Sequence, residues 1–218
     1  MIDSESTQSP AIVPILTTEH FTLQGARTAI ISEISSRATI YLTAVSSSVV
    51  ALAFVTSLSD SETTVRGFVL VLLPVLAFMG FATRERLTQL SYADFQYVRA
   101  INLIRHFYVD VAPQAAQYLM LSIHDDMPGV AQTAVYQQGR RMGVLTASFM
   151  IAVVNYVIVG LLAGLVVAWT TGSGAIMLFA VGIAVGVLTA FIDLRRQAAN
   201  WQRFMASMAV RFPTPDEA

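Results

Sequence analysis

Hydrophobic residues are concentrated in four long stretches that are separated by shorter polar segments. The stretches cover residues 39–58, 66–83, 143–169 and 175–194. Two long parts of them, residues 67–83 and 142–169, contain no Asp, Glu, Lys, Arg or His. A helix needs about 20 residues to cross the roughly 30 Å of hydrocarbon in a bilayer. The pattern therefore predicts an all-α integral membrane protein with four transmembrane helices.

The polar segments differ greatly in length. Residues 59–66 and 170–174 form short turns, so the two helices on either side of each turn are expected to be antiparallel neighbours. The second and third stretches are instead separated by a long connection. We therefore expect two transmembrane hairpins with helical extensions in the cytoplasm.

Helical periodicity continues outside the spans. We expect a helix over residues 18–37, before the first span. After the second span, apolar residues recur at alternating steps of three and four from Leu87 to Tyr108, which is the heptad spacing of coiled coils. Asp94 interrupts this pattern. It either sets register or oligomeric state, or is a solvated position on an ordinary amphipathic helix.

The long connection has signals for further helices. Asp110 and Pro113 are typical of a helix start, which predicts a helix to about His124, and Met127-Pro128-Gly129 would end it. Another helix is expected from about Val130 into the third span. Because no stretch has the alternation of a β-strand, we expect a small helical bundle beneath the membrane.

These expectations divide the chain into four consecutive segments. The segments are a flexible N-terminal tail (1–17); a cytoplasmic helix, the first hairpin and its amphipathic extension (18–110); a cytoplasmic helical connector (111–142); and the second hairpin with a C-terminal helix (143–218).

Arginine is distributed unevenly around the predicted spans. The long connection and the segment after the fourth span carry most of it, whereas the two short turns hold only Arg66. Since cytoplasmic loops carry the excess of basic residues, both termini are expected in the cytoplasm, with the protein in a bacterial inner membrane. Arginines near the span ends also suit anionic lipid head groups, although topology alone explains them. They are Arg84, Arg86, Arg140, Arg141, Arg195 and Arg196.

Composition narrows the choice of partners. The 218 residues are 55% hydrophobic and 12% charged, against about 25% charged in soluble domains, so the lipid bilayer is the expected environment. A formal net charge of -1 argues against nucleic acid as a partner. The chain has no cysteine, which excludes disulfides and thiolate metal sites. No cofactor is expected.

Small and polar residues within the spans are candidates for helix packing. Gly160 and Gly164 in the third span, and Gly182 and Gly186 in the fourth, have the GxxxG spacing that lets helices approach closely. This spacing favours packing within the hairpin, with packing between subunits as the alternative. Asn155 is expected to bond to a partner helix or to line a cavity.

The first two spans hold the candidates for a pore. Thr39, Thr43, Ser46 and Ser47 follow one face of the first span. They line a water-filled pore, or they bond to carbonyls of their own helix or to a neighbouring helix. Pro74 is expected to kink the second span, which would suit a gate but needs no such role.

Two polar groups are candidates for chemistry. His124, Asp125 and Asp126 include ligand types for a divalent ion and a group that moves protons. Consecutive residues at a helix end cannot all face one centre, so we expect no metal or catalytic site there. Asp193 is the single ionisable candidate within the spans, and its place at the cytoplasmic end of the fourth span argues against coupled transport.

One segment carries a resemblance to known proteins. The sequence Tyr97-Val-Arg-Ala-Ile-Asn-Leu-Ile-Arg-His-Phe-Tyr108, followed by Ala112-Pro113 and His124-Asp125-Asp126, resembles a group of uncharacterised bacterial four-span membrane proteins from GC-rich genomes. This resemblance covers much of the chain and implies no activity. The layout of a hairpin with a cytoplasmic extension is also similar to SLATT membrane modules, which implies a pore-forming effector. No SLATT motif residue matches, and this chain has a second hairpin.

Three functional hypotheses follow. The first is a non-enzymatic, self-associating membrane protein, a homo-oligomer whose cytoplasmic helices form an assembly or regulatory platform. The second is a homo-oligomeric ion channel or membrane-perturbing effector. The third is a lipid enzyme at the membrane interface, with its chemistry near His106, His124, Asp125 and Asp126.

Overall fold

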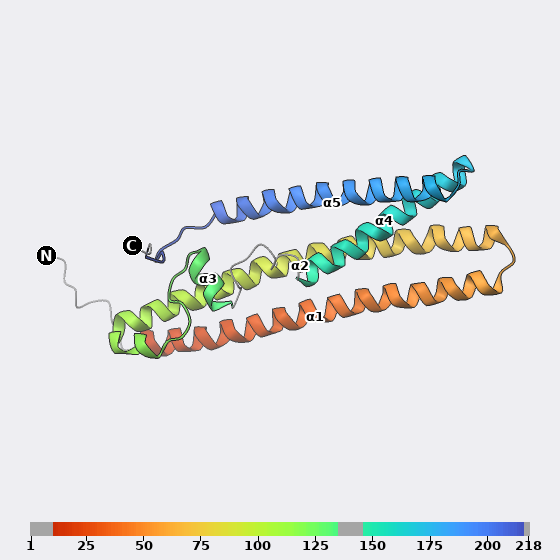
Figure 1. Ribbon diagram of the computed structural model, residues 1–218. Helices are drawn as coiled ribbons and strands as arrows, with labels where there is room; N and C mark the ends of the chain where they lie inside the picture. Colours follow the sequence, from red (N-terminus) through yellow and green to blue (C-terminus); the bar gives the residue numbers. More distant parts are fainter. Residues whose placement is uncertain (1–10, 135–145, 216–218) are drawn as a thin grey trace. The chain divides into compact units, whose positions relative to one another are not determined.

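The computed structural model describes residues 11–134 and 146–215, and every regular element in these ranges is a helix. The prediction of an all-α protein is confirmed. In chain order (Figure 1), the elements are α1 (Ile12–Leu58), α2 (Glu62–Val111), the 3-10 helix η1 (Pro113–Tyr118), α3 (Met127–Thr133), α4 (Ala147–Thr171) and α5 (Ala175–Ala206).

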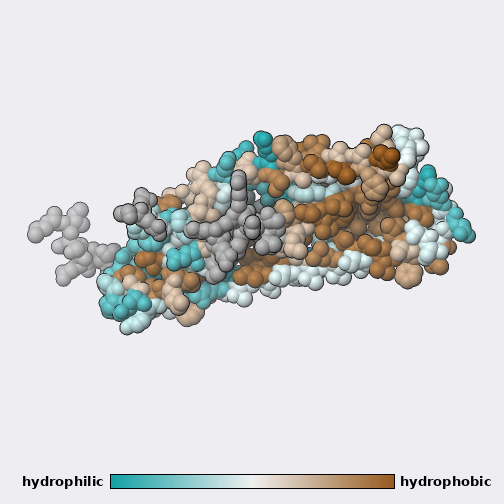
Figure 2. Space-filling model, in the orientation of Figure 1, coloured by the Kyte–Doolittle hydropathy of each residue, from teal (hydrophilic) through white to brown (hydrophobic). Residues whose placement is uncertain are grey.

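Four of these helices are long and apolar enough to cross a membrane, namely α1, α2, α4 and α5. Helices α1, α2 and α5 each contain one of the hydrophobic stretches that the sequence predicts as spans, and α4 contains residues 147–169 of the third stretch, of which residues 143–145 lie outside the described residues. Many of their large apolar side chains are exposed (Figure 2). Such a surface is unfavourable in water and suits contact with lipid.

The first two helices are longer than expected. Helix α1 begins at Ile12, so residues 12–17, which were expected in the flexible tail, are helical. Pro14 is tolerated in this first turn because the N–H groups there have no partner within the helix. Helix α2 continues without interruption from Glu62 to Val111, through its apolar stretch, the internal Pro74 and the heptad segment.

The prediction of a helix to about His124 is wrong. Only the short 3-10 helix Pro113–Tyr118 forms, and the chain that follows is not helical. Met127-Pro128-Gly129 begins a helix instead of ending one, because Asp126 is the N-cap of α3 and its side chain accepts a hydrogen bond from Gly129 N at 3.0 Å. Proline in the first turn is compatible with this role.

The chain forms two compact units, which we describe separately. Among the described residues, unit 1 contains residues 11–33, 90–134 and 209–215, and unit 2 contains residues 34–89 and 146–208. Neither unit is one continuous segment, since α1 and α2 each contribute to both.

Unit 1 has its own apolar core, formed by Leu23 of α1 with Ile101 and Ile104 of α2. Tyr97 and Tyr108, which belong to the same heptad pattern, pack against it. Asp94 is not a solvated position. It is buried, and its Oδ1 accepts a hydrogen bond from Arg27 Nε of α1 at 2.8 Å.

In unit 2, α4 and α5 are joined by residues 172–174 and pack against each other. Gly172 ends α4 with a φ of 64°. This left-handed conformation is readily adopted by glycine and costs energy for residues with a Cβ. The tight turn therefore depends on glycine at this position.

Candidate functional site

The glycines of α4 and α5 face one another across the contact between the two helices. A Cβ atom on Gly160 would overlap the carbonyl oxygen of Gly182, and Gly164 is equally confined. A Cβ atom on Gly186 would lie 3.1 Å from the carbonyl oxygen of Tyr156. Both GxxxG sequences thus contribute to packing between helices of one chain, where the absence of side chains allows the backbones to approach.

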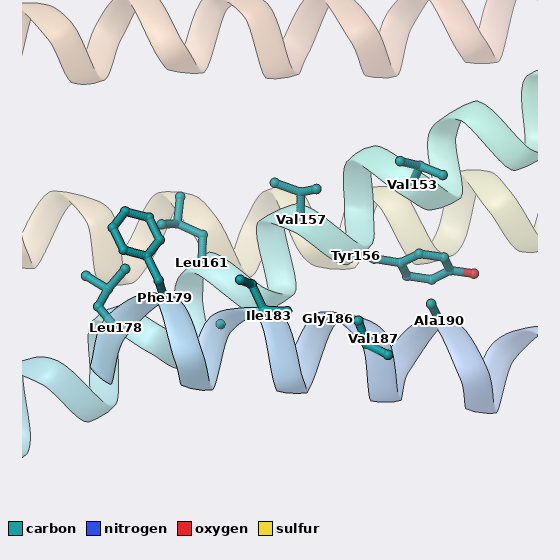
Figure 3. Close-up of a pocket in the computed structure, with 11 residues that line it drawn as sticks. Val153, Tyr156, Val157, Leu161, Leu178, Phe179, Ile183, Gly186, Val187 and Ala190 are labelled. Atoms are coloured by element: carbon teal, nitrogen blue, oxygen red, sulfur yellow. The ribbon is translucent and has the colours of Figure 1, made fainter. Parts of the chain in front are cut away.

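An apolar groove of about 430 Å³ runs beside this glycine contact (Figure 3). We call it the α4–α5 groove. Helix α4 contributes Val153, Val157 and Leu161, and α5 contributes Phe179 and Ile183 (Figure 3). The remaining residues of its lining are Tyr156, Leu178, Gly182, Gly186, Val187 and Ala190. The groove holds almost no polar surface, so it fits a hydrocarbon chain or an apolar helix face.

A buried charged cluster links three helices of unit 2. Arg84 of α2 forms an ion pair with Asp193 of α5, and the Tyr156 hydroxyl of α4 donates a hydrogen bond to the same carboxylate. The Arg84 side chain is only 5% exposed, and its guanidinium carbon lies 5.6 Å from the centre of the Tyr156 ring. This geometry combines an ion pair with a cation–π contact.

Asn155 lies in a second polar contact of unit 2. Its Oδ1 accepts a hydrogen bond from the Tyr41 hydroxyl at 3.4 Å, and both residues have no exposed surface. Gly80 of α2 leaves the space for this pair, because a Cβ atom there would overlap the Asn155 side chain. The amide therefore contacts α1 and α2 instead of lipid, and the bond to Oδ1 offsets part of the cost of a polar group in hydrocarbon, whereas Nδ2 is buried with no hydrogen-bond partner among the described residues.

A polar cavity of about 430 Å³ lies between α2 and α5, beside the charged cluster. Gln197 Nε2 donates a hydrogen bond to Thr88 Oγ1 at 3.1 Å, which joins the two helices within its lining. The complete lining is Phe81, Arg84, Glu85, Thr88, Thr189, Ile192, Asp193, Arg196, Gln197 and Asn200.

In unit 1, the residues 209–214 bind to the turn around Asp125 and Asp126, and we call this segment the C-terminal clasp. Asp125 accepts hydrogen bonds from the backbone N–H groups of Arg211 (3.0 Å) and Phe212 (2.7 Å), and it pairs with Arg99 at 2.7 Å. Asp126 accepts from Thr214 N and Thr214 Oγ1 at 2.7 and 2.8 Å. The Phe212 ring stacks on His106, with 3.6 Å between ring centres.

Both carboxylates of this turn are held in their charged form. Burial by itself would raise the pKa of Asp125, but the hydrogen bonds from Phe212, Arg99 and Arg211 outweigh it and lower the pKa. The pKa of Asp126 is lowered in the same way, because the hydrogen bonds from Thr214 and Gly129 exceed the cost of burial.

The chemistry expected of His124, Asp125 and Asp126 is limited by these contacts. Within residues 11–134 and 146–215, no group of three His, Cys, Asp or Glu side chains is placed to hold a metal ion. The two carboxylates are occupied by the clasp and by the N-terminus of α3. For Asp125 and Asp126, this arrangement fastens a backbone segment.

The four pore candidates all lie on exposed surface of α1: Thr39, Thr43, Ser46 and Ser47. Thr39 Oγ1 donates a hydrogen bond to the carbonyl oxygen of Ser35 at 2.9 Å, within the same helix. Of the six arginines named above, Arg84 and Arg196 line the polar cavity, and Arg195 lies over the Phe191 ring at 4.8 Å. Arg86 is exposed. Arg140 and Arg141 lie outside the described residues.

Sequence reasoning missed several members of these clusters. The sequence pattern gives no functional role to Tyr156, Gly80 or Gln197, because such residues are ordinary in hydrophobic and amphipathic helices. For Arg84 it indicates only topology and lipid contact. Tyr156 had one usable signal, since it stands beside Asn155 in a span and its hydroxyl needs a partner there. Their pairing depends on contacts between distant segments.

No protein-family model, curated protein or solved structure compared with this chain is similar to it.

Proposed function

We propose that this chain is a multi-pass protein of a bacterial inner membrane that self-associates and has no enzymatic activity of its own. Its spans form two hairpins, both termini lie in the cytoplasm, and the helices of unit 1 provide an assembly or regulatory platform. The observation that carries this proposal is the α4–α5 groove, which the chain's own described residues leave open.

The surfaces of α1 and α5 support association. The most apolar window of α5 contains no buried residue, and that of α1 is 6% buried. In lipid, helices associate through shape and small residues because apolar side chains gain little from leaving the hydrocarbon. A concave groove next to a glycine contact offers such a shape.

The occupant that fits the groove is α1 of a second copy. The exposed face of α1 carries the small side chains of Thr43, Ser46 and Ser47. Hydroxyls on this helix bond to their own backbone, as Thr39 does to Ser35 and Ser48 does to Ala44 at 2.7 Å. If Thr43, Ser46 and Ser47 make the same bonds to their own helix, this face enters an apolar groove without leaving hydroxyl groups unsatisfied. Because groove and helix face are different surfaces, repeated docking forms a ring where the rotation between copies closes and an open filament where it does not.

A bulky residue in the groove tests this proposal. Ile183→Trp would fill the groove, and Leu188→Trp is the matched control, since both residues are exposed on α5 but Leu188 does not line the groove. We expect the wild type and Leu188→Trp to be oligomeric in lipid nanodiscs or mild detergent and Ile183→Trp to be monomeric, as measured by mass photometry.

A crosslink identifies the occupant. In a chain without cysteine, Ser47→Cys and Ile183→Cys on separate, co-expressed copies should form a disulfide between copies when copper phenanthroline is added as the oxidant. A wild type that is monomeric at all concentrations would contradict self-association. An oligomer that is unaffected by Ile183→Trp would contradict the groove as its interface.

A second candidate function is a homo-oligomeric channel, and one observation favours it. All four polar candidates on α1 are exposed instead of packed within the chain, so they are available to line water in an oligomer that other surfaces hold together and that leaves this face of α1 outside the α4–α5 groove. The protein in liposomes would then pass ions, and Ser46→Leu or Ser47→Leu would abolish the flux. Val50→Leu is the control, because Val50 is an exposed apolar residue of the same helix. Oligomers without flux would support the platform over the channel.

A further inference from the structure

The polar cavity between α2 and α5 contains charges of both signs. Arg84 and Arg196 contribute two positive groups to its lining, and Glu85 and Asp193 contribute two negative groups. The formal charge of the lining is therefore balanced. An ion of a single sign would meet attraction and repulsion together, whereas a group with both charges would find a partner for each.

Arg84 carries the clearest sign of a missing ligand. Its side chain is 5% exposed, and it pairs with Asp193 through one terminal nitrogen, Nη2. The other two guanidinium nitrogens, Nε and Nη1, are buried and have no hydrogen-bond partner within residues 11–134 and 146–215. Buried donors of a charged group are costly when unpaired, and a phosphate presents oxygens in the spacing that a guanidinium matches.

The position of the cavity along the helices indicates an amphiphilic ligand. Phe81 and Ile192 belong to the hydrophobic stretches of α2 and α5, whereas Arg196, Gln197 and Asn200 lie beyond the end of the α5 stretch. One part of the lining thus suits contact with the hydrocarbon of the bilayer, and the other part suits contact with its polar interface. Phospholipid head groups occupy this boundary.

We propose that this cavity binds a zwitterionic phosphoethanolamine group, supplied by a phospholipid of the bilayer. Arg84 and Arg196 bind the phosphate, and Glu85 and Asp193 accept hydrogen bonds from the ammonium. The inference does not depend on self-association, because all of the lining belongs to a single chain. It narrows the anionic-lipid expectation for these arginines to a head group with both charges.

Lipid titration of the delipidated, full-length protein in detergent tests the proposal. Native mass spectrometry would measure apparent dissociation constants for dioctanoyl lipids with phosphoethanolamine, phosphocholine or phosphoglycerol head groups, separately for each oligomeric state. Phosphoethanolamine should bind about tenfold more tightly than the other two, the effect of one charge-assisted hydrogen bond. Phosphocholine has no N–H to donate, and phosphoglycerol has no cation.

Two variants separate the charges of the cavity. Arg196→Gln should raise the apparent dissociation constant for the phosphoethanolamine lipid by about tenfold. Its matched control is Arg195→Gln, which removes the same charge from a neighbouring residue outside the lining. Glu85→Gln should reduce the preference for phosphoethanolamine over phosphoglycerol. Glu85 and Arg196 are exposed residues, so these variants keep the fold.

Soluble probes identify the source of the group. If free phosphoethanolamine at matched concentration displaces the lipid and inorganic phosphate does not, the site remains and its ligand is a soluble phosphate ester. If neither displaces the lipid, the ligand is the phospholipid. Equal affinity for the three lipids, or equal losses in Arg196→Gln and Arg195→Gln, would overturn the proposal.

Discussion

At the scale of single residues, unit 2 depends on glycines at its helix contacts and on one ion pair that is buried on the Arg84 side. Gly160 and Gly182 permit contact between backbones, and Gly80 makes room for Asn155. The Arg84 and Asp193 pair places charge between helices that are otherwise apolar. Both features are sensitive to small changes. Closely packed backbones leave no room for an added atom, and water cannot solvate a buried charge that has lost its partner.

Gly160→Ala is expected to destabilise the contact between α4 and α5, because the added methyl overlaps the carbonyl oxygen of Gly182. Overpacking of this kind costs about 1–3 kcal/mol. Gly67→Ala is the control, since a Cβ atom on Gly67 meets nothing within 4 Å. Thermal unfolding in detergent should show a lower midpoint for Gly160→Ala alone. Equal midpoints would contradict the close packing.

Asp193→Asn is expected to lower stability by about 3 kcal/mol, because it leaves the buried Arg84 without its counter-charge. The exposed pair of Glu62 and Arg66 provides the comparison, and Glu62→Gln should change stability by less than about 1 kcal/mol. Chemical unfolding of both variants in the same detergent would measure the difference. Arg84→Met in the Asp193→Asn background should recover part of the loss, and a purely additive double variant would argue against the pair.

At the scale of elements, the C-terminal clasp is an extended segment held by side chains of a distant turn. Its backbone N–H groups at Arg211 and Phe212 donate to Asp125, which satisfies groups that a helix or strand would otherwise pair. The clasp therefore depends on the charge of two carboxylates. The clasp should therefore be held at neutral pH and weakened in acid.

Acid should release the clasp. The pKa values of Asp125 and Asp126 are lowered in the folded chain, so their stabilising contribution is complete above the ordinary Asp pKa of about 3.9 and is lost as the pH falls through the lowered values. A spin label on Pro213→Cys should become mobile in that acid range. A label on Tyr118→Cys, an exposed site outside the clasp, should show no such change.

The Asp125→Asn, Asp126→Asn double variant provides a further control for this prediction. Without the two charges, the label at position 213 should be mobile at neutral pH and show little further change in acid. A label that stays immobile in the double variant would mean that the stacking of Phe212 on His106 is sufficient to hold the clasp.

At the scale of the whole molecule, the arginine distribution predicts that the short turns lie outside and the long connection inside. The structure improves the choice of sites for testing this topology. Ser122 is buried, whereas Met120 is 92% exposed. Since the chain has no cysteine, single cysteines can be introduced at Met120 and at the exposed Ser61 and Gly174.

A membrane-impermeant maleimide should label Ser61→Cys and Gly174→Cys in intact cells, and Met120→Cys only after permeabilisation. The physical reason is the lower cost of keeping the arginine-rich connection on the cytoplasmic side. Labelling of Met120→Cys from outside intact cells would reverse the proposed orientation.

The sequence by itself determined that the chain is all-α with four helices able to cross a membrane, because long apolar stretches have few alternatives to a helix in hydrocarbon. It also indicated the glycine spacing of α4 and α5. Local signals were weaker at element ends. From these signals, the predicted start of α1 is too late, and Met127-Pro128-Gly129 is predicted to end a helix. In the structure this segment begins α3, because the side chain of Asp126 caps the helix.

Only the tertiary structure decided which polar residues meet. Asp94 alone is a break in a heptad pattern, and Asp193 alone is a carboxylate near an interface. Their partners, Arg27 and Arg84, come from distant parts of the chain. The same holds for the clasp at Asp125 and for the cavity with unpaired Arg84 donors. Periodicity reports which face of a helix is apolar, but the energy of a buried charge depends on the group that the fold brings to it.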